Sequence, residues 1–528
     1  MAGPTLHLQA TLRPLRRFSV LTLTALLWPQ AADAQWLDAQ LPRRGELQVG
    51  VSGQNLTVDE RFEPGGSRQP LSEVFAVQFD ARLLPALDTV DAALAGLFAS
   101  LDLPAPEPSS LGVLRHDALL ERTRAPISLT LGVTDWLAAF AVVPIVKGKS
   151  FVGSALDSLA VNAGSIASAF GGDADGFFTG FGAGMAALES IVLADTLPPD
   201  LQAQAVALLN EADTLETGLT DLRGLAYVPT DSSDAGRELT GRYEALRAGF
   251  QEFEVLLPAL SLARPITVSE ALLLSSGEEF GIEPTQGRST GIKLGDIELG
   301  ISLQPFNTFR QRPRQPRARF PVRARLDALW RLASGSAPRP ERLMDLGAGD
   351  GQPDLEVRST LDVGYGTRIW LSLFAGYNLQ LETTTERLIS SRESPIQLGA
   401  YVARVHWDPG DVLTLAAAPR LNLTRNITFS ALYVLRRRGE DRVTAADGAP
   451  PDTAGFHPTD TQTGSEYTAR SLGFAARYAS TEWAGDRRRG IPVEVELRYL
   501  QTNSARDGFA PKENVWQVGL RLYGVIFR

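Results

Sequence analysis

Val515–Arg528 reads VWQVGLRLYGVIFR and alternates apolar with polar residues. In an extended chain, one face of this segment carries Trp516, Val518, Leu520, Leu522 and Ile526. The other face carries Gln517, Gly519, Arg521 and Tyr523. An apolar face opposite a charged face is typical of a strand that meets lipid on one side and a polar interior on the other. The segment therefore predicts the closing strand of a transmembrane β-barrel.

The same period-two alternation recurs upstream of this strand. It is clearest from Leu355 to Val363 and from Val493 to Tyr499, where polar residues, most of them charged, occupy alternate positions. Strands are expected to start near residues 46, 113, 136, 291, 318, 353, 367, 397, 427, 467, 492 and 514. We therefore predict an all-β, antiparallel transmembrane barrel of about 12 strands, because single-chain bacterial barrels have even numbers. This count takes Gln397–Leu423 as one irregular strand, whereas a turn at Trp407–Asp411 leaves counts of about ten or fourteen open.

The N-terminus has the order of a secretory signal peptide. Arg13, Arg16 and Arg17 precede an apolar run from Phe18 to Trp28, and Ala32–Asp33–Ala34 supplies a small-residue cleavage site. Residues 1–34 are therefore expected to be removed after export. A signal peptide followed by a β-barrel predicts that the protein is located in the outer membrane of a Gram-negative cell.

Composition narrows the classes of partner and chemistry. Removing the three arginines and one aspartate of the signal peptide moves the formal net charge from -10 to -12. This acidity argues against nucleic-acid partners, which are bound by basic surfaces. The chain has no cysteine, so disulfides and thiolate chemistry are excluded.

A helical region interrupts the strand pattern. Leucines, alanines and aromatic residues recur at steps of three and four from Leu201 to Leu222 and from Leu239 to Leu257, which predicts an antiparallel helical hairpin. A similar series runs from Leu83 to Leu101, and Asp231–Asp234 is expected to hold a turn and a helix cap. We expect four segments: signal peptide 1–34, barrel strands 35–152 with a short helical loop, helical insertion 153–263 in an extracellular loop, and barrel strands 264–528.

Charged residues on the polar faces of the predicted strands are the candidate functional residues, and we expect them to line the barrel lumen. They are Arg323, Arg325, Asp327, Glu356, Arg358, Asp362, Glu494, Glu496, Arg498 and Arg521. If these charges pair across a narrow barrel they form a polar plug, and if water separates them they line a channel. Both signs are present, so strong ion selectivity is not expected.

Enzymatic and metal chemistry have little support in the sequence. Beyond the signal peptide, the histidines are His116, His406 and His457, and no spacing places one beside a nucleophilic serine. Asp173–Gly176 and Asp345–Asp354 place acidic residues near glycine, but neither completes a calcium loop. No enzyme activity, cofactor or metal is predicted.

Short glycine-containing motifs resemble a known family. Leu131–Trp136 continues to Val143–Val146, and Lys293–Gly300 reads KLGDIELG. Together with Gly349–Glu356, these segments resemble the outer-membrane proteins of the phenol-degradation meta-pathway family. The resemblance implies an outer-membrane barrel that moves small, often aromatic or apolar, molecules.

Two functions follow as expectations. The first is a channel for passive passage of small hydrophobic or aromatic solutes. The alternative is a structural or surface-recognition barrel with a plugged lumen and a helical insertion that binds a partner. In either case the expected partners are outer-membrane lipid and the barrel-assembly machinery, which would recognise the C-terminal strand. The channel adds small-molecule solutes to these partners.

Overall fold

The computed structural model describes residues 39–275, 285–309, 319–340, 345–366, 368–389, 401–446, 457–462, 464–480 and 492–527. The predicted signal peptide lies outside these residues. The chain divides into two compact units. A barrel unit takes Met1–Val74, Ala118–Phe151 and Gly287–Arg528, and a helical unit takes Phe75–Asp117 and Val152–Gln286.

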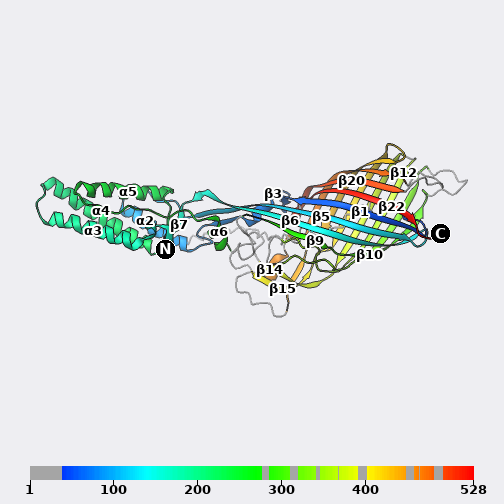
Figure 1. Ribbon diagram of the computed structural model, residues 1–528, viewed down its shortest axis with the longest axis horizontal. Helices are drawn as coiled ribbons and strands as arrows, with labels where there is room; N and C mark the ends of the chain where they lie inside the picture. The colour runs from blue at the N-terminus through cyan, green and yellow to red at the C-terminus, as the bar shows by residue number, and fades with distance from the viewer. Residues whose placement is uncertain are drawn as a thin grey trace, which may run out of the picture. The chain divides into compact units, whose positions relative to one another are not determined.

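Twelve antiparallel strands close into a barrel, as predicted (Figure 1). Around the ring the order is β5-β1-β22-β20-β19-β17-β16-β13-β12-β11-β10-β6, and pairing of β6 with β5 closes it. The strands are β1 (Glu46–Val58), β5 (Leu111–Gly132), β6 (Leu137–Val161), β10 (Glu298–Asn307), β11 (Val322–Arg331), β12 (Asp354–Tyr365), β13 (Ile369–Gln380), β16 (Val412–Asn422), β17 (Ile427–Arg438), β19 (Tyr467–Ala479), β20 (Val493–Arg506) and β22 (Asn514–Val525). β1 pairs with β22 from Glu46↔Val525 to Thr57↔Asn514, so the first and last strands are neighbours.

The barrel has two distinct rims. β1 begins and β22 ends at one of them, which we call the terminal rim. Because each strand reverses direction, the turns between β5 and β6, β12 and β13, and β16 and β17 lie at this rim. The opposite rim, which we call the loop rim, receives the longest connections, including β1 to β5, β6 to β10 and β11 to β12.

The outer face of the barrel is an apolar belt. Exposed outward side chains include Leu299, Ile301, Trp330, Leu371, Leu373, Val518 and Leu520. Their neighbours along each strand point inward and are buried, as the strict alternation of β13 illustrates. An apolar band outside and polar residues inside are the arrangement of a transmembrane β-barrel.

Two details of the strand prediction are wrong. Gln397–Leu423 is not one strand, because β15 (Tyr401–Asp408) ends before Pro409–Gly410 and β16 begins at Val412. Gly410 approaches Gly439 so closely that a Cβ would lie 2.0 Å from the Gly439 carbonyl oxygen, which fixes a turn there. The barrel still has 12 strands, because β15 pairs outside the barrel ring. The strand expected near residue 291 is also divided, into β9 (Thr285–Leu294) and β10.

Small sheets occupy the connections at the loop rim. One consists of β14 (Thr383–Ile389), β15 and β18 (Arg442–Ala445). Another consists of β2 (Glu60–Phe62), β3 (Arg68–Pro70) and β21 (Ala510–Pro511). β7 (Ala163–Ser165) pairs with β8 (Tyr227–Pro229), and β4 (Val77–Phe79) and β9 pair with β5 and β6.

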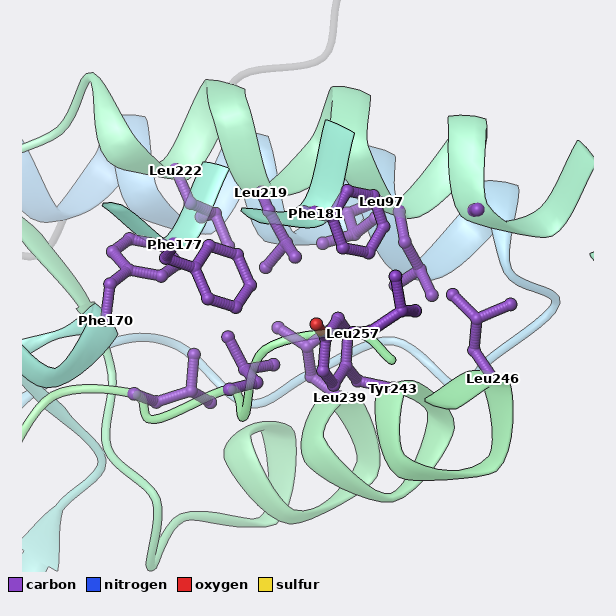
Figure 2. Packing of buried hydrophobic residues seen from close by; sticks show 14 of the residues in the cluster. Leu97, Phe170, Phe177, Phe181, Leu219, Leu222, Leu239, Tyr243, Leu246 and Leu257 are labelled. Atoms are coloured by element: carbon purple, nitrogen blue, oxygen red, sulfur yellow. The ribbon is translucent and has the colours of Figure 1, made fainter. Parts of the chain in front are cut away.

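The helical unit is built around one apolar core (Figure 2). Its helices are α2 (Ala86–Ser100), α3 (Ala174–Leu193), α4 (Pro199–Arg223), α5 (Asp234–Glu252) and α6 (Val268–Leu274). α4 packs against α2, α3 and α5. Leu219 and Leu222 of α4 meet Leu239, Tyr243 and Leu246 of α5 across this core, as the heptad pattern predicted.

The structure adds a helix that the sequence analysis did not single out. α3 is long and apolar enough to cross a membrane by length and composition. Its Phe177 and Phe181 are nevertheless buried in the helical core and contact the Tyr243 ring. Phe177, Phe181, Gly184 and Leu188 follow one another at steps of three and four, and this helical spacing predicts α3 from the sequence. Two helices predicted to bury each other are therefore part of a larger bundle.

Candidate functional site

The candidate lumen residues all lie on the inward face of the barrel. Eight of them are buried: Arg323, Arg325, Asp327, Arg358, Asp362, Glu494, Arg498 and Arg521. Glu356 and Glu496 are partly buried. The register of β11 on β12 pairs Arg323 with Asp362 and Asp327 with Arg358, which brings opposite charges side by side.

Glu298 is the centre of the largest group, which we call the Glu298 cluster. Its carboxylate is fully buried and lies 3.2 Å from Arg124, 3.6 Å from Arg331 and 3.9 Å from Arg358. Arg331 also lies 2.7 Å from Asp354 and 3.4 Å from Glu356, which in turn lies 2.7 Å from Arg358. A buried carboxylate is stabilised only when such partners replace its hydration.

Nearer the terminal rim, the carboxylate of Asp362 joins two barrel strands to the segment before β1. It accepts hydrogen bonds from Arg323 Nε at 2.7 Å, Ser372 Oγ at 2.5 Å and the Ala39 backbone N–H at 3.2 Å. Gln304 donates to the Ala39 carbonyl. The segment that begins at Ala39 therefore lies inside the barrel.

A second charged group lies on β19, β20 and β22, and we call it the Glu494 cluster. Glu494 lies 2.9 Å from both Arg477 and Arg521 and accepts a hydrogen bond from the Tyr523 hydroxyl at 3.1 Å. Beside it on β20, Arg498 lies 2.5 Å from Glu496. All these groups share the inward face of adjacent strands.

The two clusters occupy opposite walls. In the 12-strand ring, β11 and β20 are separated by half the circumference. The ion pairs named above join residues on one strand, on adjacent strands, or on strands two positions apart in the ring. They therefore run along the wall. The Glu298 cluster contains three arginines and three carboxylates, and the Glu494 cluster contains three arginines and two carboxylates.

An apolar strip lies on the inward face between the two clusters. It consists of Phe374, Ala416, Ala418, Leu432, Val434 and Ala475, from β13, β16, β17 and β19. Inward positions of a transmembrane barrel are usually polar, so a buried apolar strip there departs from the general pattern. Small alanines beside Leu432 and Phe374 leave this part of the wall without charge.

Sequence reasoning missed part of this site. Glu298, Arg124, Arg477 and Asp354 complete the clusters but were not candidates. Glu298 alternates along β10 with the small inward residues Gly300 and Ser302 on the same face, so the alternation alone predicts that it points inward. Arg124 lies in a segment with a weak pattern around Pro126, and only strand pairing reveals its partner.

Other residues noted in the sequence have structural roles. Asp173 caps α3, with its carboxylate accepting a hydrogen bond from the Gly176 N–H at 2.9 Å. Ser233 caps α5 in the same way, as the polar run predicted. His406 lies on β15, where its Nδ1 is 3.0 Å from the Thr384 hydroxyl.

Comparisons with known proteins give distant likenesses. No family model and no curated protein matches the sequence. Among solved structures, an outer-membrane channel from Pseudomonas putida F1 is 9% identical, with 94% of this chain and 99% of that chain covered and a TM-score of 0.38. The CymD monoaromatic hydrocarbon channel is 9% identical over 96% of this chain and 98% of its own, with a TM-score of 0.28. The Pseudomonas putida toluene transporter TodX is 10% identical over 97% and 95%, with a TM-score of 0.25. At scores this low, the strand pairing described above, rather than these likenesses, carries the fold assignment.

Proposed function

We propose that the protein is an outer-membrane channel for the passive passage of small hydrophobic or aromatic solutes. The observation that carries this proposal is the apolar strip inside a closed barrel, flanked by clusters in which each named charge lies beside one of opposite sign. A solute without charge gains from contact with apolar surface, and the charges on either side of the strip are held in ion pairs along the wall. The candidate lumen residues then act as the polar border of the path.

The family proposal rests on the motifs of the sequence and not on the comparisons. We place the chain with the transporter-like barrels of the phenol-degradation meta-pathway family on the strength of Leu131–Val146, Lys293–Gly300 and Gly349–Glu356. The outer-membrane location, the export by residues 1–34, the extracellular position of the helical insertion and recognition of β22 by the assembly machinery belong to the same proposal.

Uptake measurements test the solute class. Liposomes containing lipopolysaccharide exclude N-phenyl-1-naphthylamine, whose fluorescence rises when it enters a membrane interior. The folded protein is expected to accelerate its entry, and Leu432→Gln in the strip is expected to slow that entry several-fold. Leu329→Gln is the matched control, because Leu329 is an equally buried inward leucine on β11, away from the strip. Equal rates for the two variants would exclude the strip as the path.

A specific observation favours the second candidate, a structural or recognition barrel. Ala39 and Leu41 are buried in the barrel unit, and Asp362 and Gln304 hold Ala39. If this segment and the ion pairs fill the barrel, folded protein will show neither conductance nor uptake. The helical unit would then be the functional part, as a module that binds a partner.

Removing the helices separates the two candidates. The chain enters and leaves the bundle at adjacent points, because a Cβ on Gly164 would lie 2.1 Å from the Arg264 carbonyl oxygen. Residues 166–262 are therefore replaceable by a short linker, provided that α2 is removed as well, since its buried face shares their core. A channel is expected to keep conducting, whereas a recognition protein is expected to lose its partner with no change in permeability.

A further inference from the structure

Asp296, which lies just before β10, joins two separate segments of the barrel unit. Its Oδ1 accepts a hydrogen bond from the Gly335 N–H at 2.8 Å, and its Oδ2 accepts one from the Asp350 N–H at 3.2 Å. Both donors belong to the connection between β11 and β12 at the loop rim. A single buried carboxylate thus holds both described ends of this connection against the wall.

The glycines of the motifs are explained by this contact. A Cβ on Gly349 would lie 2.4 Å from both carboxylate oxygens of Asp296, and a Cβ on Gly335 would lie 2.8 Å from the Gly349 backbone. Only glycine permits the two backbones to cross over the carboxylate. The two motifs Lys293–Gly300 and Gly349–Glu356 are therefore halves of one contact.

The segment held by Asp296 lies on the inner side of the wall. We call Leu346–Gln352 the strap. A Cβ on Gly148, which is an inward position of β6, would lie 3.0 Å from the Leu346 Cβ. A Cβ on Gly295 would lie 3.1 Å from the Ala348 carbonyl oxygen, and the Ala348 and Gly349 N–H groups both donate to the Ser336 carbonyl. Leu346 and Ala348 are buried as a result.

We propose that the strap narrows the channel at the loop rim and that the Asp296 carboxylate is the latch that holds it there. The inference rests on the proposed channel function, because a strap narrows a passage only if there is one. Two glycines of the wall, Gly148 and Gly295, leave room for the strap, and Gly349 of the strap leaves room for the Asp296 carboxylate. Loss of the Asp296 hydrogen bonds releases the strap from this seat and widens the mouth.

A cysteine in the strap measures docking directly, because the chain has no cysteine of its own. Leu346→Cys is expected to react slowly with a membrane-impermeant maleimide, since position 346 is buried. Adding Asp296→Asn is expected to speed the reaction by about tenfold, because an amide cannot accept from both N–H groups. Adding Asp345→Asn is the matched control. Asp345 has the same charge and lies in the same connection, but its carboxylate accepts from Arg339 and Gly347 of that connection. Equal labelling rates in the two variants would overturn the latch.

A reversible cross-link tests the narrowing. A Cβ at position 148 would lie 3.0 Å from the Leu346 Cβ, about 0.5 Å short of the spacing in a disulfide, so a small outward shift of the strap brings Gly148→Cys/Leu346→Cys into bonding geometry. In planar bilayers, the oxidised protein is expected to conduct less than the reduced protein, and Asp296→Asn is expected to raise conductance only in the reduced state. A cross-link that forms without changing conductance would overturn the strap as a constriction. If labelling depends on Asp296 while neither the wild-type protein nor the reduced cysteine variant conducts, the latch is supported and the channel function fails.

Discussion

At the residue scale, Glu298 is the centre of the largest charged cluster on the inner wall. It is fully buried and faces three arginines on β5, β11 and β12. Glu298→Gln is expected to destabilise the folded barrel by about 3–5 kcal/mol, because it leaves buried cations without their anion. Denaturant unfolding in detergent, followed by tryptophan fluorescence, measures the change. Asp408→Asn removes the same charge from a pair with exposed Arg442 and is expected to cost about 0–1 kcal/mol. Equal losses would show that the cluster does not act as a buried network.

Asp350 makes docking of the strap dependent on pH. It lies in the connection between β11 and β12, where burial, followed by the charges of Asp354 and Asp296, raises the pKa of its carboxyl to about 7. Arg331 opposes this shift, and Arg122 of β5 also faces the group. The Asp350 carboxyl holds its proton more tightly when the strap is docked than when it is released. Docking therefore weakens as the pH rises from the ordinary range of an aspartate toward the raised pKa of Asp350. Above that pKa, docking does not weaken further.

The consequence is measurable as a difference between two pH values. The Leu346→Cys labelling rate is expected to rise several-fold more between pH 6 and pH 8 than in the same protein carrying Asp350→Asn. The variant corrects for the pH dependence of the thiol itself. Identical ratios would mean that Asp350 does not control the strap.

At the element scale, the packing of α2 on α4 depends on one glycine. A Cβ on Gly218 of α4 would lie 2.2 Å from Leu97 Cδ1, whereas a Cβ on Gly96 of α2 would meet nothing within 4 Å. Gly218→Ala is expected to destabilise the helical unit by about 1–3 kcal/mol through overpacking. Gly96→Ala is expected to stabilise it by up to about 1 kcal/mol through helix propensity. Thermal melts of the full-length protein followed at 222 nm compare the two, and a loss of stability in both would contradict the packing argument.

The elements also show what the sequence could predict. Period-two alternation located strands such as β12 and β20 within one or two residues, because most inward residues of β12 and of the first half of β20 are polar and most outward residues are apolar. It did not separate β15 from β16, because Trp407 is buried in an accessory sheet while keeping the alternation of a barrel strand. The same alternation predicted an inward position for the candidate charges, and eight of the ten are buried. Partners such as Arg124 and Glu298 depend on strand order, which no local pattern contains.

At the scale of the whole molecule, the belt of apolar side chains predicts how the barrel responds to charge at different depths. Leu361 and Leu355 both occupy outward positions of β12, with Leu361 nearer the middle of the strand and Leu355 next to its end at the loop rim. In a bilayer, Leu361→Arg is expected to cost about 2–4 kcal/mol, because the midplane offers no water to the guanidinium, whereas Leu355→Arg is expected to cost about 0–1 kcal/mol. Unfolding and refolding into lipid vesicles measure both costs. In a barrel surrounded by water, the cost of an arginine would not depend on its position along the strand. Equal costs for the two variants would therefore contradict a membrane-spanning barrel and the proposed channel.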